Sequence, residues 1–318
     1  MSAILPAANR ILRIGSRGSK LAVWQAEWVK ARLEERGEVC RIEIIKTTGD
    51  KILDVPLARI GGKGLFTKEI EEALLEERID LAVHSLKDLP TELPQGLTVA
   101  SIPQREDPRD ALVGATLEAL PSGARVGTSS LRRSAQLRAL RPDLEILDVR
   151  GNVDTRLRKQ QDGQYDALVM ASAGLTRLGL EAHIAEYLNP AEFLPAAAQG
   201  ALAIETRDDG GVAFEACQAL RDPRATAEVT AERALLAGLG GGCQVPLGAH
   251  AIAHGDQLCL RALVVSPDGQ RVFRKEITGE IASAARLGAE LATQFLASEA
   301  RRIIEAVDAA PAEPPREG

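Results

Sequence analysis

The sequence predicts an α/β fold of two similar lobes that face each other as a clamshell, followed by a small α+β domain. Over the first hundred residues, short apolar runs alternate with amphipathic segments of helical spacing, which is typical of a parallel sheet with right-handed crossovers. The segment RIGS at residues 13–16 recurs as RVGT at residues 125–128. Beyond residue 247, three strand-like runs joined by Gly-Asp and Pro-Asp-Gly turns indicate an antiparallel three-stranded sheet.

The first lobe is predicted to begin with a strand, a helix and a second strand. Residues 11–16 (ILRIGS) suit a buried strand, and Ser19 is a good N-cap for the helix that follows. That helix carries apolar residues at helical spacing and ends at Gly37: Leu21, Trp24, Trp28 and Ala31. The remaining predicted elements are a strand at 40–45, a glycine loop at 61–64, a helix at 67–77 and a strand at 80–84.

The second lobe is predicted to repeat this order. Residues 125–128 form a strand whose small polar turn opens a helix, like the corresponding segment of the first lobe. We expect further strands at 145–149 and 166–170, proline-marked connections at 102–110 and 193–200, and a strand returning to the first lobe at 201–206. Tandem lobes of this kind place a ligand in the cleft, beyond the carboxyl ends of the strands.

The third domain is predicted to start with a helix that Asp222 caps and Pro223 opens, and that stops near residue 239. Strands at 248–253, 257–265 and 270–278 follow, and a helix carrying Leu287, Leu291 and Phe295 closes the domain. The predicted boundaries are 10–103 with 200–218 for the first lobe, 104–199 for the second, 221–308 for the third domain, and 309–318 for a disordered tail.

Composition excludes several classes of protein. The 39 Lys and Arg residues against 45 Asp and Glu residues give a net charge of −6, which argues against a nucleic-acid-binding protein. No apolar run approaches the length of a membrane helix, and the N-terminal residues do not resemble a signal peptide, so we expect a cytoplasmic protein. The four cysteines, with no CxxC pair, are expected to be reduced thiols in that compartment: Cys40, Cys217, Cys243 and Cys259.

The turn at residues 15–20 (GSRGSK) lacks the spacer of a nucleotide-binding phosphate loop. It still offers free backbone N–H groups, a serine cap and Arg17 at a helix start, which suits an anion. A solvated helix N-terminus explains this turn equally well.

Residues 125–159 hold nine basic and four acidic side chains within an acidic protein. A solvated surface run is the usual explanation of such a stretch. Here, however, Arg150 follows the carboxyl end of a predicted strand, where binding residues belong. Because arginine pairs bidentately with carboxylates and phosphates, we infer a ligand bearing several acidic groups.

The segment HSLKD at residues 84–88 also follows a predicted strand end. An acid beside Lys87 in a basic cleft should stay ionised, so Asp88 can stabilise a cation or accept hydrogen bonds from N–H groups. A structural Lys–Asp turn is the alternative. Likewise, the glycine loop at residues 61–64 is either a lid on the cleft or an ordinary flexible connection.

Cys243 follows three glycines, which remove side-chain bulk and let a thin loop present its thiol. A small hydrophobic residue under a loop is the alternative. A zinc site with His250, His254 and Cys259 is rejected, because these residues are predicted to lie on a hairpin and their spacing fits no common zinc finger. We therefore predict no metal site.

Taken together, these segments resemble the porphobilinogen deaminase (hydroxymethylbilane synthase) family over residues 12–307. The strings that carry the resemblance are RIGSRGSKLAVWQ (13–25), GGKGLFTKE (61–69), AVHSLKDLP (82–90), REDPRD (105–110), VGTSSLRR (126–133), RGNVDTRL (150–157), AQGALAIE (198–205) and GGCQVP (241–246). Each string is weak alone, but their common order is highly specific.

The resemblance implies two lobes of the type II periplasmic-binding-protein class and a third domain that carries a dipyrromethane cofactor on a thioether to Cys243. It implies a monomeric transferase of heme and other tetrapyrrole (porphyrin) biosynthesis. Such an enzyme joins four porphobilinogen molecules head to tail with loss of ammonia, and hydrolysis releases hydroxymethylbilane. Porphobilinogen and its growing polypyrrole chain carry many carboxylates, which suits the inferred basic cleft.

The resemblance also implies roles for individual residues. Asp88 matches the catalytic aspartate, which holds pyrrole N–H groups and stabilises the cation left by ammonia. Lys63 matches a lysine of the lid loop. The residues implied to hold cofactor and substrate are Arg17, Ser19, Ser85, Lys87, Thr128, Ser130, Arg132, Arg133, Arg150, Arg156, Arg177 and Gln199. Arg59 stands where some members have lysine, and Ala198 replaces a glycine, which is expected to stiffen the connection slightly.

A second hypothesis is a non-catalytic clamshell that binds an acidic small molecule. It does not explain why Asp88 and the glycine-presented Cys243 occur in one chain. Neither hypothesis involves nucleic acid or a membrane as a partner.

Overall fold

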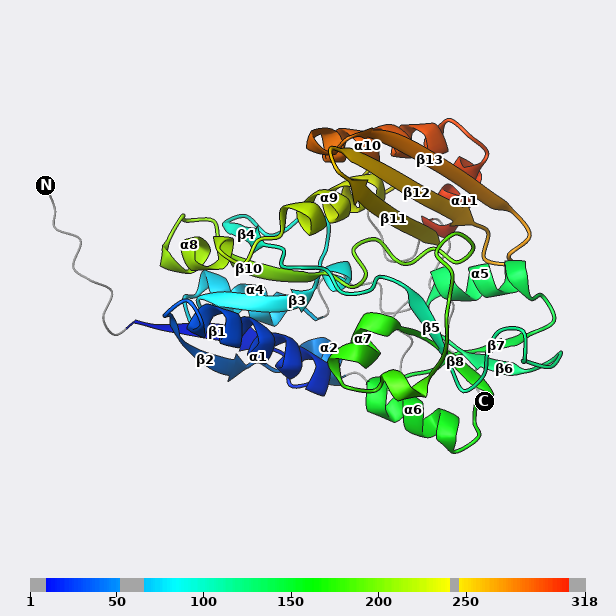
Figure 1. Cartoon of the computed structure of the whole chain (residues 1–318), viewed down its shortest axis with the longest axis horizontal. Helices are drawn as coiled ribbons and strands as arrows, with labels where there is room; N and C mark the ends of the chain where they lie inside the picture. The colour runs from blue at the N-terminus through cyan, green and yellow to red at the C-terminus, as the bar shows by residue number, and fades with distance from the viewer. Residues whose placement is uncertain (1–9, 52–65, 241–245, 309–318) are drawn as a thin grey trace, which may run out of the picture.

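Two five-stranded sheets with the same topology form the two lobes (Figure 1). The computed structural model describes residues 10–51, 66–240 and 246–308. The first sheet has the order β2-β1-β3-β10-β4 and contains β1 (Ile11–Ser16), β2 (Val39–Ile44), β3 (Leu81–Ser85), β4 (Leu97–Ser101) and β10 (Leu202–Arg207). The second has the order β7-β6-β8-β5-β9 and contains β5 (Asp110–Val113), β6 (Arg125–Gly127), β7 (Glu145–Leu147), β8 (Ala167–Ala171) and β9 (Ile184–Tyr187).

Each sheet is mixed rather than fully parallel, which corrects the expectation from the βαβ pattern. In the first sheet β1 pairs in parallel with β2 and β3, whereas β10 pairs antiparallel with β3 and β4. The second sheet repeats this arrangement, with β5 in the position of β10. The chain crosses between the lobes twice, first from β4 to β5 and then from β9 to β10. Each crossing ends in the antiparallel strand, which lies next to the central strand of its sheet. The predicted return of the chain to the first lobe is confirmed.

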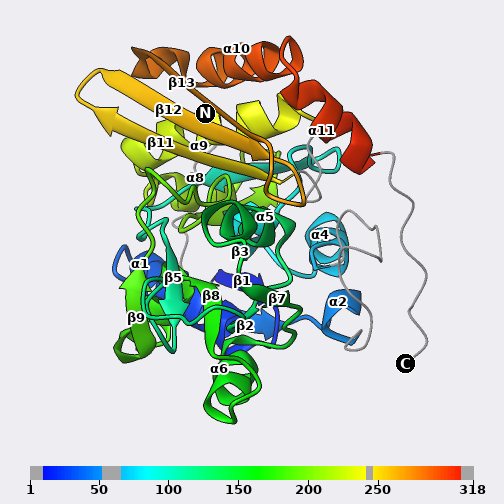
Figure 2. The same ribbon diagram turned by 90° about the vertical axis from the view of Figure 1, so that its right-hand side faces the viewer.

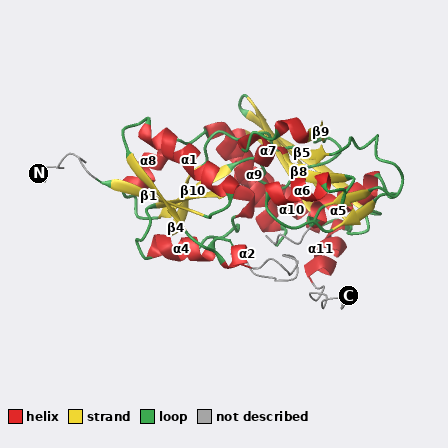
Figure 3. Cartoon of the chain, turned by 90° about the horizontal axis from the view of Figure 1, so that it is seen from below, coloured by secondary structure: helices red, strands yellow, loops and turns green. Residues whose placement is uncertain are grey.

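Helices cover both faces of the first sheet (Figure 3). On one face, α1 (Lys20–Glu34) and α8 (Val212–Gln218) pack on Leu12 and Ile14; on the other, α4 (Lys68–Leu75) packs on Ala82. The Ser19 hydroxyl caps α1 by accepting from the Ala22 amide at 3.3 Å, as the sequence predicts. The remaining helical segments of this lobe are α2 (Thr48–Lys51) and η1 (Leu86–Asp88).

The second lobe contains α5 (Leu131–Leu140), α6 (Val153–Gln161), α7 (Ser172–Arg177) and the 3-10 helix η2 (Glu181–His183). Ser130 caps α5 at the position that Ser19 occupies on α1, so the sequence repeat is also a structural repeat. Lys20, at the start of α1, pairs with Asp154 in the first turn of α6, which joins the two lobes.

The third domain lies above both lobes in Figure 1 and packs α9 and α10 on a three-stranded antiparallel sheet. Its elements are α9 (Pro223–Gly238), β11 (Leu247–His254), β12 (Gln257–Val265), β13 (Val272–Glu280), η3 (Ile281–Ser283), α10 (Ala284–Leu296) and α11 (Ala300–Asp308). The predicted hairpin holding His250, His254 and Cys259 is confirmed.

The prediction that α10 closes the domain is wrong, because α11 follows it (Figure 2). Ile303 and Ile304 of α11 are buried in the same core as Phe295. Ala300, Ile303, Ile304 and Val307 recur at helical spacing, so the sequence carried a signal for this helix that the prediction did not use. The predicted disordered tail lies outside the described residues. No helix in the described ranges is long and apolar enough to cross a membrane.

A buried carboxylate ties the third domain to both crossings of the chain. Glu232 of α9 accepts two hydrogen bonds at 2.9 Å from Arg105, which lies in the first crossing. It also accepts from the amide of Ala198 in the second crossing at 2.6 Å, and from the Ala251 amide of β11 at 2.8 Å. Ala198 has a φ of 61°, a conformation that glycine adopts more readily.

Candidate active site

Lys87 and Asp88 form the first lobe's part of the candidate active site. They lie in η1, directly after the carboxyl end of β3. The Asp88 carboxylate is exposed and the Lys87 side chain is half-buried. Desolvation lowers the pKa of Lys87 to about 8, with the repulsion of Arg133 adding to it and the attraction of Asp88 opposing it. Through Gln199, Lys87 of η1 is connected to Asp110 of the second lobe.

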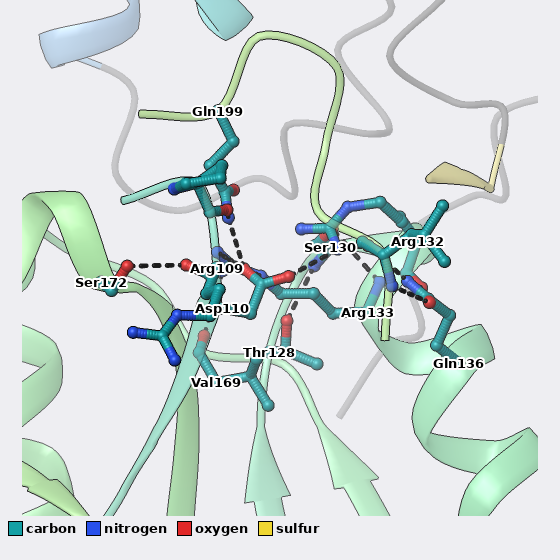
Figure 4. Close-up of polar contacts among 12 residues, drawn as sticks. Arg109, Asp110, Thr128, Ser130, Arg132, Arg133, Gln136, Val169, Ser172 and Gln199 are labelled. Atoms are coloured by element: carbon teal, nitrogen blue, oxygen red, sulfur yellow. Dashed lines mark hydrogen bonds and ion pairs between the residues drawn. The ribbon is translucent and has the colours of Figure 1, made fainter. Parts of the chain in front are cut away.

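Asp110 is the centre of the second lobe's part (Figure 4). Its carboxylate lies 2.6 Å from Nη1 of Arg132 and 2.7 Å from Nη2 of Arg133, and all three side chains are buried. Burial alone would raise the pKa of Asp110, but the two guanidinium groups hold it well below its usual range. The carboxylate is therefore ionised, and the group of three keeps one net positive charge.

Gln199 connects this ionic group to the first lobe. Its Nε2 donates to Asp110 at 2.9 Å and to the Pro108 carbonyl at 2.8 Å, while its Oε1 accepts from Lys87 Nζ at 3.3 Å. The Gln199 side chain is buried and its backbone carbonyl accepts from Arg105 at 3.0 Å. The amide thus fixes the distance between Lys87 and Asp110.

Arg150 and Arg156 of the second lobe are not neutralised by an ion pair among the described residues. Nη2 of Arg150 is buried without a hydrogen-bond partner. Arg156 Nε donates to the Gly151 carbonyl at 2.8 Å. Burial lowers the pKa of Arg156 to about 10, with repulsion from Arg133 and Arg150, and only Asp88 opposes it. A buried, unpartnered guanidinium nitrogen indicates a site for an anion.

Arg177 is buried at the end of α7, and its Nη2 donates to the Gly200 carbonyl at 2.6 Å. Burial lowers its pKa to about 10, so the guanidinium stays charged at neutral pH. It lines an open groove of about 610 Å³ between the lobes, together with residues of the α1 N-terminus and the end of α7: Gly18, Lys20, Val23, Trp24, Leu178 and Gly179.

The hydroxyl groups predicted for the site lie at the turns around the cleft. Ser19 and Ser130 cap α1 and α5, and Thr128 accepts from the Ser130 amide at 3.2 Å. Capping uses an oxygen lone pair and leaves the hydroxyl proton for a ligand. Ser85 accepts from Gln25 Nε2 at 3.0 Å.

Arg17 completes the first lobe's cations. Its guanidinium lies 4.1 Å from the centre of the Phe66 ring, a cation–π contact. The ring therefore helps to orient Arg17 at the start of α1, where the sequence predicts an anion site.

The comparison with known protein families decides the identity. Residues 12–213 match the family described as "Porphobilinogen deaminase, dipyromethane cofactor binding domain", and residues 226–297 match "Porphobilinogen deaminase, C-terminal domain". The chain belongs to the porphobilinogen deaminase family. The resemblance identified from the sequence is thereby confirmed.

Individual relatives agree with this assignment. The chain is 51% identical over 304 residues to porphobilinogen deaminase of Syntrophobacter fumaroxidans, covering 94% of this chain and 98% of that protein. It is 55% identical over 303 residues to porphobilinogen deaminase of Nitratidesulfovibrio vulgaris, covering 93% and 96%.

Among solved structures, a periplasmic substrate-binding protein of an ABC transporter from Coxiella burnetii is 13% identical. It matches 68% of this chain and 94% of that chain with a TM-score of 0.43. Because this TM-score is low, the fold class is assigned from the two sheets described above and not from this similarity.

Two residues that the porphobilinogen deaminase resemblance singled out, Cys243 and Lys63, lie outside the described residues, as does the glycine loop at 61–64. Burial raises the pKa of Cys40 to about 11 and that of Cys217 to about 12. These two thiols are therefore protonated and unreactive at neutral pH.

Sequence reasoning missed Asp110 and Gln25, which hold predicted site residues of this deaminase-family chain in place. Asp110 is the last residue of the REDPRD string and directly precedes three buried apolar residues. A carboxylate at the start of such an apolar strand needs a buried cation as its partner. This pattern in the sequence could have identified Asp110.

The basic stretch at residues 125–159 is not one continuous patch. Arg125 pairs with Asp166 and Arg141 with Asp143 near the surface, whereas Arg132 and Arg133 pair with Asp110 in the interior. What the cleft of this deaminase-family protein presents to a ligand is the remaining charge, above all that of Arg150 and Arg156.

Proposed function

We propose that the protein is a hydroxymethylbilane-forming transferase with porphobilinogen deaminase activity. It joins four porphobilinogen molecules head to tail, releases ammonia at each addition, and frees hydroxymethylbilane by hydrolysis. Family membership supports this proposal over a non-catalytic solute-binding clamshell. The observation that carries it is the set of uncompensated cations opposite Asp88, with a buried Arg150 nitrogen that has no partner.

A dipyrromethane cofactor fits the residues of the cleft. It is built from porphobilinogen and carries acetate and propionate groups, for which buried arginines and Lys87 are suitable partners. Bound through a thioether to Cys243, the cofactor supplies the covalent end on which the chain grows. The residues proposed to hold it are Ser85, Lys87, Thr128, Ser130, Arg132, Arg133 and Gln199.

Arg132 and Arg133 already bind Asp110, so each offers a ligand only its remaining N–H groups. Their geometry is therefore set before a ligand arrives. This preorganisation lowers the cost of ordering long side chains on binding.

The substrate's carboxylates are proposed to bind Arg150 and Arg156, with Arg17, Ser19 and Arg177 nearby. Asp88 is proposed as the catalytic residue. Its exposed carboxylate accepts hydrogen bonds from pyrrole N–H groups and stabilises the positive charge that develops as ammonia leaves. Lys63 is proposed to act as the lid-loop lysine that the resemblance implies. We place the enzyme in the cytoplasm as a monomer of tetrapyrrole biosynthesis, with no nucleic-acid or membrane partner.

The test is the intact mass of purified protein together with porphobilinogen turnover. We expect a mass increase equal to one dipyrromethane, which Cys243→Ser abolishes. Cys259→Ser, which removes a half-buried thiol of the same domain, should keep the adduct and serves as the control. An unmodified mass in freshly prepared protein, with no turnover of porphobilinogen, would overturn the proposal.

A second variant tests Asp88. Asp88→Glu should keep the mass adduct but lose most turnover, because a carboxylate displaced by one methylene is poorly placed for the reacting atoms. Near-normal turnover would refute the role of Asp88 while leaving the cofactor assignment intact.

A further inference from the structure

His84 and Glu205 form a buried hydrogen-bonded pair below the candidate active site. His84 Nε2 lies 3.0 Å from Glu205 Oε2, and the side chains are 5% and 0% exposed. His84 lies opposite Ala203 in the antiparallel pairing of β3 and β10, so Glu205 is its diagonal neighbour on the same face of the sheet. Because a carboxylate only accepts, Nε2 is the donor.

A second buried carboxylate, Glu71, lies on the helix that packs over this face of the sheet. α4 packs on the face of the sheet that carries Ala82, and His84 shares that face because it is two residues further along the strand. Glu71 of α4 is 7% exposed. Glu71 Oε1 and Glu205 Oε1 are both buried without a hydrogen-bond partner. Two unpartnered carboxylate oxygens at one interface would be costly if both groups were ionised.

We propose that Glu71 is protonated in the folded protein and donates its proton to Glu205, so that Glu71, Glu205 and His84 form one hydrogen-bonded chain. A single proton then satisfies both unpartnered oxygens. Glu205 keeps the negative charge and accepts from Glu71 on one side and from His84 on the other.

The surroundings of Glu71 agree with a neutral acid. Burial raises the pKa of Glu71, and the negative charges of Glu205 and Glu72 act in the same direction, against the Thr67 hydroxyl and His84. Arg207 of β10 lies on the same face but is engaged by the Leu74 and Ile79 carbonyls at 2.9 Å. It is also engaged by Asp80 and Asp209. The other strands packed on α4 add no compensating cation. β4 (LTVAS) has no charged residue, and Arg13 of β1 is engaged by Asp80 at 2.9 Å.

The hydrogen-bonded chain connects α4 to the end of β3, and this gives it a positioning role that rests on the proposed function. His84 directly precedes Ser85 and lies four residues before Asp88. Glu71 and Glu205 therefore act through His84 to hold the strand end from which η1 projects. They are positioning residues, because they lie beneath the cleft and are buried from it.

The proton is tested by the pH dependence of unfolding in wild type, Glu71→Gln and the control Glu72→Gln. Glu72 is exposed on the same helix. A glutamate in the unfolded chain has its ordinary pKa of 4.5, whereas folded Glu71 keeps its proton above that pH, so folding takes up a proton there. The folding equilibrium constant of wild type should therefore fall by up to tenfold per pH unit, relative to Glu71→Gln, until the folded group titrates. Glu72→Gln should retain the wild-type dependence.

Two further readouts separate the proton from the positioning role. An infrared difference spectrum of wild type minus Glu71→Gln should contain the C=O band of a protonated carboxyl group. For turnover, Glu71→Leu, which removes the donor, should lower kcat at least fivefold with KM changed less than twofold. Glu71→Gln, which restores a donor, should recover most of the lost kcat.

An unchanged pH dependence in Glu71→Gln, or the absence of the infrared band, would overturn the shared proton. Equal kcat values in Glu71→Leu and Glu71→Gln would overturn the positioning role. If wild type has no porphobilinogen turnover, the proposed function fails, yet the unfolding and infrared results still decide the shared proton.

Discussion

The Lys20 ammonium lies 2.9 Å from the Asp154 carboxylate, and this ion pair spans the two lobes. Lys20 stands at the N-terminus of α1, where the helix dipole disfavours a positive charge, and Asp154 offsets this from the first turn of α6. Their side chains are 76% and 42% exposed, so water and salt screen the attraction.

We predict a weak coupling for this pair. A double-mutant cycle with Lys20→Gln and Asp154→Asn, measured by denaturant unfolding, should give a coupling free energy below about 1 kcal/mol. At about 1 M salt the coupling should vanish, because the Debye length falls to about 3 Å. A coupling that persists at high salt would show that the pair is shielded from solvent.

Asp110 should be far more important for stability than a surface carboxylate. Asp110→Asn leaves the buried guanidinium groups of Arg132 and Arg133 without their counter-charge, and we expect a loss of roughly 3–5 kcal/mol of unfolding free energy. The matched control is Asp143→Asn, which breaks a pair with Arg141 near the surface and should cost little. Similar losses in the two variants, measured by urea unfolding, would contradict this account.

The same carboxylate predicts acid sensitivity. Its two guanidinium partners depress the pKa of folded Asp110 below the unfolded value of 3.8. The stability it contributes is therefore present above that pH and is lost as the pH falls towards the folded pKa. Asp110→Asn should accordingly show a shallower decline of unfolding free energy below about pH 4 than wild type. If the unfolding free energies of the two proteins decline equally at acid pH, this account of Asp110 is contradicted.

Lys87 should contribute a dependence of the same sign at alkaline pH. Its pKa is about 8 in the folded protein and 10.5 when unfolded, so between these values the unfolded chain binds more protons. Stability relative to Lys87→Met should therefore rise over that window, measured in a Cys243→Ser background that lacks the attachment thiol. Lys30→Met is the control, because a hydrogen bond to Glu34 raises the pKa of Lys30 instead. A flat difference for Lys87→Met would show that its folded pKa is not depressed.

Ala198 should tolerate glycine better than its neighbour Ala201 does. Both methyl groups are buried in one apolar cluster, but only Ala198 has a positive φ, 61°. A left-handed conformation costs an alanine roughly 1–2 kcal/mol, and Ala198→Gly recovers this. That recovery offsets the lost methyl burial of about 0.8 kcal/mol and the added chain entropy of about 0.5–1 kcal/mol.

Ala201→Gly has the same losses without this recovery. By thermal or denaturant unfolding, Ala198→Gly should therefore be at least about 1 kcal/mol more stable than Ala201→Gly. The opposite order would mean that the backbone relaxes at Ala198 and stores no strain.

Elements governed by local signals could be predicted from the sequence. The caps at Ser19, Ser130 and Asp222 each accept from the predicted helix N-terminus, and the hairpin of β11 and β12 follows its Gly-Asp turn. The antiparallel placement of β10 between β3 and β4 could only be anticipated in outline, because its register depends on residues about 120 positions away.

Sequence position also singled out candidate site residues. Strand-end positions singled out Lys87, Asp88 and Arg150 as candidates, and in the structure the charges of Asp88 and Arg150 both act on Arg156. The partners that fix them, Asp110 and Gln25, could not be found by periodicity, because whether a polar side chain is buried depends on contacts between lobes. Cys243 and Lys63 lie outside the described residues, so their roles stay predictions.

The position of β10 has a consequence for the order in which the chain matures on the ribosome. The strands of the second lobe, β5 to β9, are contiguous in sequence, so that lobe can complete its sheet soon after residue 187 emerges. The first lobe cannot, because among the described strands β4 pairs only with β10, and β10 ends at residue 207. Until then the edge of β3 is open to pairing with other chains. The lobe that is synthesised first is the second to be finished.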